Sequence, residues 1–402
     1  MKRSIFAFLV LGAIFAGCSK DETTTPVVSS SDEKVITDQT ELNKAMVYQN
    51  VPITFEGGLK MGSGFTLEAT ALSPTVSGVK LSATYVIFRN NKAYVTYHER
   101  GEGHKGYVRV YDVSTPATPV ITTALAFSDI DINAADINQA GTKLYLAGSS
   151  FKKGAVLLVI DLDGTGNLTA PYVTVPVGSP AASANGVIQA SNYLYVSVGS
   201  TNGGLYALNA TDYTVVGNDL YDGASFSTAN GRVNGKRHAA LEGNVVDSKL
   251  HVYKVGSVDQ ADEFVYSVGP IEHQNVEAQY TTAGKSTIFM RDNATTCFIA
   301  RGKYGMKAVD VLTGNLVYQS PVNMITYGNT NAVSQDNDYI YLANGAQGVT
   351  FATPGPGTNI TIAGIWNDDL LTPASANFVA SNSTHVFVAN GKEGGLKILL
   401  KN

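Results

Sequence analysis

The chain has 402 residues, a formal net charge of −5 at pH 7, 15% charged residues, 40 glycines and 21 tyrosines. An acidic chain lacks the basic surface that binds a phosphate backbone, so nucleic acid is excluded as an expected partner. Few charged helix formers, together with many glycines, valines and aromatic residues, favour short strands joined by tight turns. We therefore expect an all-β protein.

Residues 1–17 have the pattern of an export signal that ends at a cysteine. Lys2 and Arg3 precede an apolar stretch over 5–15, which is too short to span a membrane. The stretch ends in 16–18, Ala-Gly-Cys, which resembles the lipobox of bacterial lipoproteins, although Phe15 stands where leucine is usual. The resemblance implies a signal peptide over 1–17 and acylation of Cys18, which would anchor the mature chain to a membrane. The alternative is an ordinary signal peptide followed by an incidental cysteine.

Residues 18–45 are rich in serine, threonine and charged residues, and they predict a flexible tether. Asp21 and Glu22 resemble the export signal of surface-exposed lipoproteins in some Gram-negative bacteria, which implies a place on the outer membrane surface. Cys297 is the only other cysteine, so no intramolecular disulfide is expected once Cys18 is acylated.

One strand pattern recurs seven times in the rest of the chain. Each copy is a short apolar strand with an aromatic residue or histidine at its second place, after a polar turn and before a loop and another strand. Repeats of 43 to 56 residues built this way are typical of propeller blades. We expect a seven-bladed β-propeller over 46–402 with four-stranded antiparallel blades. The marker residues are Tyr94, Tyr145, Tyr195, His251, Phe298, Tyr341 and Phe387.

The last copy has only three strands and ends at Lys401. Its missing outer strand must come from elsewhere, and either 51–56 or 65–71 can supply it. The prediction is a ring closed by an N-terminal strand.

The segment 108–116, with the sequence VRVYDVSTP, resembles the LVIVD repeat, whose consensus Leu-Val-Ile-Val-Asp is followed by Val-Ser and a proline. Partial copies lie at 158–162 and 307–311. The resemblance covers about residues 83–402 and implies an exported bacterial β-propeller. It transfers no catalytic residue.

A ligand is expected at one mouth of the channel, among the loops between blades and those between second and third strands. The predicted loop 224–243 is basic and can recognise an anionic or sugar-like group, or can be a solvated excursion. Asparagines ten residues before three of the markers can line the mouth or cap their own strands. The candidate ligand-binding residues are Arg232, Arg237, His238, Asn185, Asn331, Asn377, Arg301 and Tyr304.

Two short segments resemble metal-binding loops, but no metal is predicted at either. The loop 98–104, HERGEGH, lacks a standard zinc spacing, and a polar glycine-rich hairpin explains it. The segment 161–167 lacks the terminal glutamate of a calcium loop and predicts a tight turn. No nucleophile elbow, P-loop or haem motif is present, so no cofactor is expected.

These observations predict a membrane-anchored, surface-exposed lipoprotein whose propeller binds a small polar ligand, a glycan or a protein partner. The alternative is a hydrolase or lyase that uses His238 or His98 with a neighbouring carboxylate, with or without a divalent ion. A redox propeller of the quinoprotein type is a third hypothesis. Histidines and carboxylates converging at the mouth would favour the enzyme, whereas asparagine, glycine and tyrosine there would favour binding.

Overall fold

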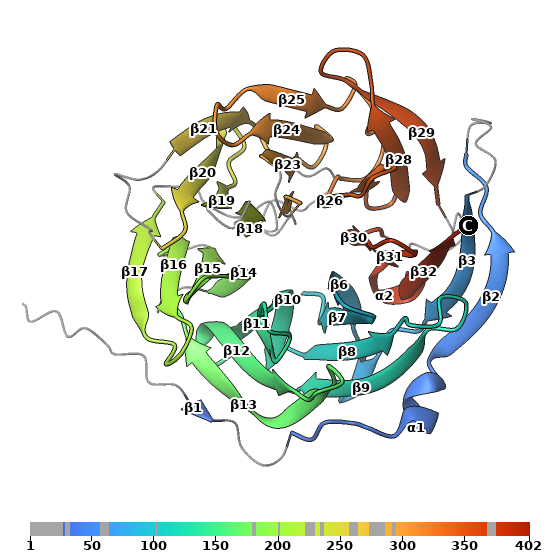
Figure 1. The fold of residues 1–402 in the computed structure, drawn as a ribbon, viewed down its shortest axis with the longest axis vertical. Helices are drawn as coiled ribbons and strands as arrows, with labels where there is room; N and C mark the ends of the chain where they lie inside the picture. Colours follow the sequence, from blue (N-terminus) through green and yellow to red (C-terminus); the bar gives the residue numbers. More distant parts are fainter. Residues whose placement is uncertain are drawn as a thin grey trace, which may run out of the picture.

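Seven antiparallel sheets stand around one central axis, so the protein is a seven-bladed β-propeller, as the repeats predict (Figure 1). The structure is a computed structural model, and it describes residues 27–28, 33–56, 64–101, 103–178, 182–199, 202–221, 230–233, 237–256, 264–272, 286–291, 295–367 and 375–402. The signal peptide and Cys18 lie outside these residues. Within them, no helix combines the length and the hydrophobicity needed to cross a membrane.

The first three blades follow the predicted order, with the strand nearest the axis first in the chain and the outermost strand last. In each of these blades the aromatic side chain of the marker residue lies on the second strand and packs against the next blade. Side chains alternate between the two faces of a strand, so its neighbours along the strand face the preceding blade. Blade 1 has β6 (Ser82–Arg89), β7 (Lys92–His98), β8 (Gly106–Asp112) and β9 (Val120–Phe127). Blade 2 has β10 (Ile130–Ile137), β11 (Lys143–Ser150), β12 (Gly154–Leu162) and β13 (Leu168–Pro176), and blade 3 has β14 (Ser183–Ala190), β15 (Tyr193–Gly199), β16 (Gly204–Asn209) and β17 (Val215–Leu220).

Blade 4 corrects the prediction, because its first two strands lie within the segment 224–243 that was expected to be a loop. β18 (Asn230–Val233) and β19 (Arg237–Glu242) form an antiparallel hairpin, and β20 (Ser248–Lys254) and β21 (Phe264–Gly269) follow outward. β18 contacts the innermost strands of both neighbouring blades, so His251 lies on the third strand and not on the second. The marker was misplaced because β19 carries the small Ala239 at the place where β7, β11 and β15 carry a tyrosine.

The last three blades restore the expected pattern, and the ring closes between the two ends of the chain. Of the two candidate closing segments, the second is right: β3 (Phe65–Ala71) pairs with β32 (Leu396–Lys401), and β2 (Met46–Pro52) adds a fifth strand outside it. Blade 5 has β22 (Ile288–Phe289), β23 (Thr296–Ala300), β24 (Met306–Asp310) and β25 (Leu316–Gln319). Blade 6 has β26 (Ala332–Gln335), β27 (Ile340–Ala343), β28 (Val349–Pro354) and β29 (Ile360–Trp366), and blade 7 starts with β30 (Phe378–Ser381) and β31 (His385–Ala389), which the short α2 (Gly391–Gly394) separates from β32.

Residues 33–45, which were expected to belong to a flexible tether, instead pack against the rim of the ring. Ile36 exchanges two backbone hydrogen bonds with Ala124 of β9, at 2.8 and 3.0 Å. Asp38 caps the helix α1 (Gln39–Asn43), and the Asn43 side chain bonds both the N–H and the carbonyl of Ile121. Farther upstream, β1 (Val27–Val28) pairs with β13. The polar composition of this segment predicted disorder. The outer edges of β9 and β13, however, provide backbone hydrogen bonds, which a polar segment can make as well as an apolar one.

The closing strand is held by a buried arginine. After β3 the chain continues into the small hairpin of β4 (Thr75–Val76) and β5 (Val79–Lys80) and then enters β6. Arg109 of β8 donates from Nη1 to the Leu72 carbonyl at 2.6 Å, and its guanidinium lies 5.5 Å and 5.4 Å from the ring centroids of Tyr97 and Tyr107. Arg109 is 5% exposed, so this cation and its aromatic neighbours fill the seam where the ring closes.

Candidate functional site

The antiparallel blades assign each loop to one of two ends of the ring. Loops between successive blades emerge at the same end as loops between second and third strands, and we call this the linking end. Hairpins between first and second strands emerge at the opposite, hairpin end. The candidate residues are therefore divided between the two ends, whereas the sequence pattern predicted all of them at one mouth. Asn185, Asn331, Asn377, Arg301 and Tyr304 lie at the linking end, whereas Arg232, Arg237 and His238 lie in the β18–β19 hairpin.

Two of the predicted asparagines join neighbouring blades at the linking end. Asn377 donates from Nδ2 to Ser82 Oγ of blade 1 at 3.2 Å, and it accepts a hydrogen bond from Ser375 Oγ at 3.0 Å. Asn331 is 9% exposed and donates from Nδ2 to the Ala376 carbonyl, at the entry to blade 7, at 3.1 Å. Both side chains therefore donate hydrogen bonds to the next blade, which is a different use from the lining of the mouth and from the capping of their own strands that the sequence suggested.

The same position in other blades holds residues that the sequence analysis did not single out. Asn133 donates from Nδ2 to the Ala184 carbonyl at 2.9 Å, and Thr84 donates from Oγ1 to the Ile132 carbonyl at 2.9 Å. Thr84, Asn133 and Asn185 are each the extra residue of a β-bulge in the innermost strand. Thr84 and Asn185 lie ten residues before their markers, whereas Asn133 lies twelve residues before Tyr145 because the first turn of blade 2 is longer. A search for asparagine at a fixed offset of ten therefore misses Thr84 by residue type and Asn133 by spacing.

The Tyr304 platform, made of Arg301, Lys303, Tyr304 and Glu272, is the most accessible group among the candidates. The Tyr304 ring is 40% exposed, with the Arg301 guanidinium carbon 5.4 Å and Lys303 Nζ 5.2 Å from its centroid. Lys303 Nζ also lies 2.6 Å from Glu272 Oε2, to which the Tyr304 hydroxyl donates at 3.4 Å. The Lys303 hydrogen bond lowers the pKa of Glu272, so its carboxylate stays charged at neutral pH. Cations over an aromatic ring are attracted to its electron-rich faces, so Arg301 and Lys303 help to hold the Tyr304 ring in place.

Backbone bonds fix the platform to the ring. Arg301 Nε donates to the Pro270 carbonyl at 3.1 Å, and Lys303 N–H donates to the Glu272 carbonyl at 2.7 Å. Gly302 and Gly305 have φ of 62° and 71°, which a residue with a side chain rarely adopts, and they let the loop turn tightly beneath Tyr304. These bonds hold the platform in one arrangement, in which an aromatic ring, two cations and one carboxylate lie in contact with one another.

A second polar group lies across the same end, between blades 1 and 2. Asp131 accepts the Glu99 backbone N–H on Oδ1 at 2.9 Å, and Lys105 Nζ lies 2.7 Å from Glu99 Oε2. Asp131 is 8% exposed, and burial raises the pKa of its carboxyl to about 7. The position two residues before the bulge is serine in blades 1 and 3, at Ser82 and Ser183, so blade 2 replaces a hydroxyl with a titrating acid. Such a group can accept or release a proton at neutral pH.

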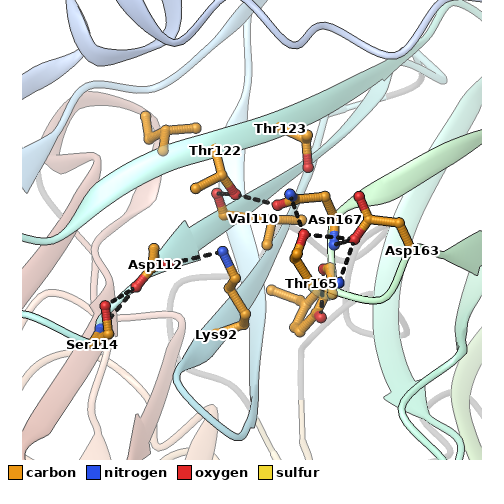
Figure 2. A network of polar contacts seen from close by, with 12 residues as sticks. Lys92, Val110, Asp112, Ser114, Thr122, Thr123, Asp163, Thr165 and Asn167 are labelled. Carbon is orange, nitrogen blue, oxygen red and sulfur yellow. Dashed lines mark hydrogen bonds and ion pairs between the residues drawn. The ribbon is translucent and has the colours of Figure 1, made fainter.

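The segment 161–167 is a tight turn, as predicted. Asp163 accepts the backbone N–H groups of Thr165 and Asn167 at 2.8 and 2.9 Å, and Asn167 Oδ1 in turn accepts the Thr122 hydroxyl of blade 1 at 2.7 Å (Figure 2). These backbone bonds go to one oxygen of Asp163, Oδ1, which also accepts the Thr165 hydroxyl at 2.7 Å. Across the described part of the chain, no group of three histidine, cysteine, aspartate or glutamate side chains is arranged to hold a metal ion, and Glu102 of the 98–104 loop lies outside it.

The aspartate of the LVIVD-like segment also has a local structural use. Asp112 accepts the Ser114 N–H at 2.9 Å and the Ser114 hydroxyl at 2.5 Å, and Lys92 Nζ lies 3.0 Å from its other oxygen (Figure 2). Asp310 receives the N–H groups of Leu312 and Thr313 in blade 5 in the same way. The aspartate therefore starts the turn between the third and fourth strands, which explains its recurrence without any ligand.

His238 is far less accessible than a loop residue would be. It is 0% exposed and lies between the rings of Tyr195 and Tyr253, with centroids 3.6 and 5.1 Å away. Among the residues that the structure describes, neither ring nitrogen has a hydrogen-bond partner, and burial lowers the pKa of His238 to about 3. Arg237 lies over the Phe264 ring at 4.8 Å, and the Arg232 side chain lies outside the described residues. His238 is consequently a neutral core side chain at pH 7, which removes it from the set of accessible bases.

Comparison with known proteins shows the fold alone. No protein-family model and no curated protein matches the chain. Among solved structures, it is similar to the WD40 propeller domain of Doa1 (TM-score 0.53, 13% identity, 82% of this chain and 97% of that one). It is also similar to U3-55K (0.54, 10%, 81% and 98%) and to the Pseudomonas aeruginosa periplasmic gluconolactonase PpgL (0.52, 11%, 88% and 94%). Identities this low establish a shared propeller architecture and carry no activity across.

Proposed function

We propose that this chain is an exported, membrane-anchored binding protein whose linking end holds a small polar ligand, with a carbohydrate as the favoured class. The observation that carries the proposal is the Tyr304 platform. Tyr304 is 40% exposed, and the accessible part of an aromatic side chain can pack against the C–H surface of a sugar ring. Beside it, Arg301, Lys303 and Glu272 supply charged donors and an acceptor for hydroxyl or carboxylate groups. A protein partner that inserts a polar side chain would meet the same chemistry.

The cellular place of the protein is part of the proposal. The lipobox-like 16–18 supports acylation of Cys18, and the acidic pair after it supports display on the surface of an outer membrane. The LVIVD-like segment supports kinship with exported bacterial propellers. Replacing Cys18 by alanine is expected to move the protein from the membrane fraction to the soluble fraction, and mass spectrometry of the wild-type protein is expected to show the acyl chains. A variant that stays in the membrane fraction would contradict the lipid anchor.

Ligand binding at the platform is tested with two matched tyrosines. Tyr304→Ala removes the platform ring, whereas Tyr327→Ala removes a ring of similar exposure, 45%, from another loop of the linking end. Neutral and acidic oligosaccharides are screened by thermal shift, and hits are measured by calorimetry. We expect Tyr304→Ala to weaken binding about tenfold, which corresponds to about 1.4 kcal/mol, with little change in melting temperature. Equal effects of the two substitutions, or unchanged binding by Tyr304→Ala, would refute the assignment.

A hydrolase or lyase is the second candidate, and Asp131 is the observation that favours it. Its carboxyl titrates near neutral pH next to the Glu99–Lys105 ion pair, and His98 ends the strand that leads into the same loop. PpgL, a protein of similar fold, is a gluconolactonase. Lactone and ester substrates are assayed between pH 5 and 9 with wild type and Asp131→Asn. Activity with a pH midpoint near 7 that Asp131→Asn abolishes would support this enzyme, and its absence from the whole panel would count against it.

A further inference from the structure

The N-terminal chain covers the outer edges of four consecutive blades (Figure 1). β1 pairs with β13 of blade 2, and Ile36 bonds Ala124 of blade 1. β2 lies outside β3 in blade 7, and Glu56 N–H bonds the Ile365 carbonyl of blade 6 at 2.8 Å. Within the residues that the structure describes, no strand pairs with the outer edges of β17 and β21. β25 of blade 5 is likewise the last strand of its sheet. Open strand edges attract partners, so the chain protects the rim of blades 6, 7, 1 and 2 and leaves that of blades 3, 4 and 5 open.

On blades 3 and 4 this open rim carries five exposed apolar side chains, and we call them the apolar rim. Asp219 is the one charged residue of β17 and β21 and is 4% exposed, and the Arg237 guanidinium of β19 lies over the ring of Phe264, one of the five. A soluble surface seldom gathers large apolar side chains on adjacent outer strands without a use for them. The members are Val215 (37% exposed), Val216 (52%) and Leu220 (47%) on β17, with Phe264 (42%) and Val265 (47%) on β21.

The length of chain before β1 limits how far this rim lies from the anchor. Cys18 stands nine residues before Val27, and a fully extended chain covers at most about 3.4 Å per residue, or about 30 Å in all. β1 is fixed to blade 2, and β13, β17 and β21 follow one another around the rim (Figure 1). An acylated Cys18 would therefore hold the edge of blade 2, and the apolar rim beside it, close to a bilayer.

From this placement we infer that the apolar rim of blades 3 and 4 rests on the lipid surface, so that the ring stands edge-on to the membrane with both ends of its axis open to solvent. The inference rests on the proposed lipid anchor and extends it. An acyl anchor gains strength when apolar side chains beside it enter the headgroup boundary. An edge-on ring also leaves the Tyr304 platform, at the linking end, free to bind a ligand.

A comparable patch on the other side of the ring provides the matched control. On β2, Val47 is 44% exposed and Val51 is 52% exposed, but β2 lies across the disc from β17 and β21 (Figure 1). An edge-on ring cannot place both sides on one bilayer. If exposure alone set the rate of chemical labelling, both patches would react at similar rates. The proposed orientation slows labelling only at the apolar rim of blades 3 and 4.

The test measures how fast single cysteines react with a membrane-impermeant maleimide. Val216→Cys, Val265→Cys and Val47→Cys are made in the full chain, reconstituted in phosphatidylethanolamine and phosphatidylglycerol vesicles, and compared with the same variants carrying Cys18→Ala. All three positions are exposed, so the substitutions spare the core. The native Cys297 is 0% exposed, and burial raises the pKa of its thiol far above the usual range, which keeps its background labelling low.

We expect the anchored chain to label at least tenfold more slowly than the unanchored chain at positions 216 and 265, and at an equal rate at position 47. Equal rates at all three positions on an acylated chain overturn the orientation and leave the anchor standing. Protection of position 47 alone also overturns it. A wild-type chain that carries no acyl groups overturns both proposals. Protection of position 216 without the anchor, with a dimer in sedimentation, assigns the rim to a second copy instead of lipid.

Discussion

Replacing His238 by phenylalanine tests the description of the seam between blades 3 and 4. Phenylalanine keeps a flat ring stacked with Tyr195 and Tyr253 and removes two nitrogens for which the described part of the chain offers no hydrogen-bond partner. A buried polar atom without a partner costs about 1 to 3 kcal/mol. We therefore expect His238→Phe to leave the free energy of unfolding at pH 7 unchanged or to raise it.

The larger effect is expected in acid. The pKa of His238 is about 3 in the folded protein and near 6.5 in the unfolded chain, so between these values the unfolded chain binds the extra proton. The titration of His238 does not affect the free energy of unfolding above pH 6.5. Between pH 6.5 and the folded pKa of about 3, it lowers this free energy by about 1.4 kcal/mol for each pH unit. At pH 5 the loss from this histidine is about 2 kcal/mol, which is roughly an eighth to two fifths of the stability of a typical domain.

The assay is urea unfolding of wild type and His238→Phe at pH 5, 6 and 7.5, followed by circular dichroism. The difference between the two proteins isolates His238, because other titrating groups are common to both. A matched control is His385→Phe, since His385 is equally buried but bonds the Pro116 carbonyl at 2.9 Å, and this variant should lose stability at pH 7.5. A pH slope that is the same in wild type and His238→Phe would refute the buried, neutral histidine.

Three further predictions concern Arg109 at the ring closure, Asn377 between blades 7 and 1, and Asp131 of blade 2. Arg109→Ala should lower the free energy of unfolding by about 2 to 4 kcal/mol in urea titrations, because the bond to the Leu72 carbonyl and the packing between blades 7 and 1 are both lost. A loss below 1 kcal/mol would contradict the role of Arg109 in closure. Asn377→Ala should cost about 1 kcal/mol by removing the bond to Ser82, and hydrogen exchange should rise mainly at the junction of blades 7 and 1 rather than uniformly. Asp131→Asn should raise the melting temperature at pH 8 and not at pH 4. The pKa of Asp131 is about 7 in the folded protein and lower in the unfolded chain, so protonation of its carboxyl stabilises the folded protein at acidic pH. This stabilisation is lost as the pH rises to 7, whereas asparagine stays neutral at every pH. An equal shift at both pH values would be inconsistent with a titrating Asp131.

The ring itself was predictable because its signal is local and repeated. A strand that packs against two neighbouring blades needs apolar residues on both faces, and an aromatic residue such as Tyr145 recurs on the second strand of every blade except blade 4. The number of blades and the closure by an N-terminal strand followed from counting these strands and finding one missing beside Leu396. The turn at 161–167 was predictable for the same reason, since an aspartate bonding the backbone two residues ahead is a short-range property.

The position of a residue at one end of the ring or the other depends on the number of strands that precede it, and an error of one strand reverses it. Blade 4 shows this: β18 and β19 carry a weak apolar pattern, so Arg237 and His238 were taken for a loop at the wrong end. Tertiary packing alone decided that 33–45 follows the rim, that His238 is stacked between tyrosines, and that Asp131 is buried beside Glu99. These outcomes arise where segments distant in sequence meet, and the chemistry of one residue is set there by neighbours that its local sequence does not contain.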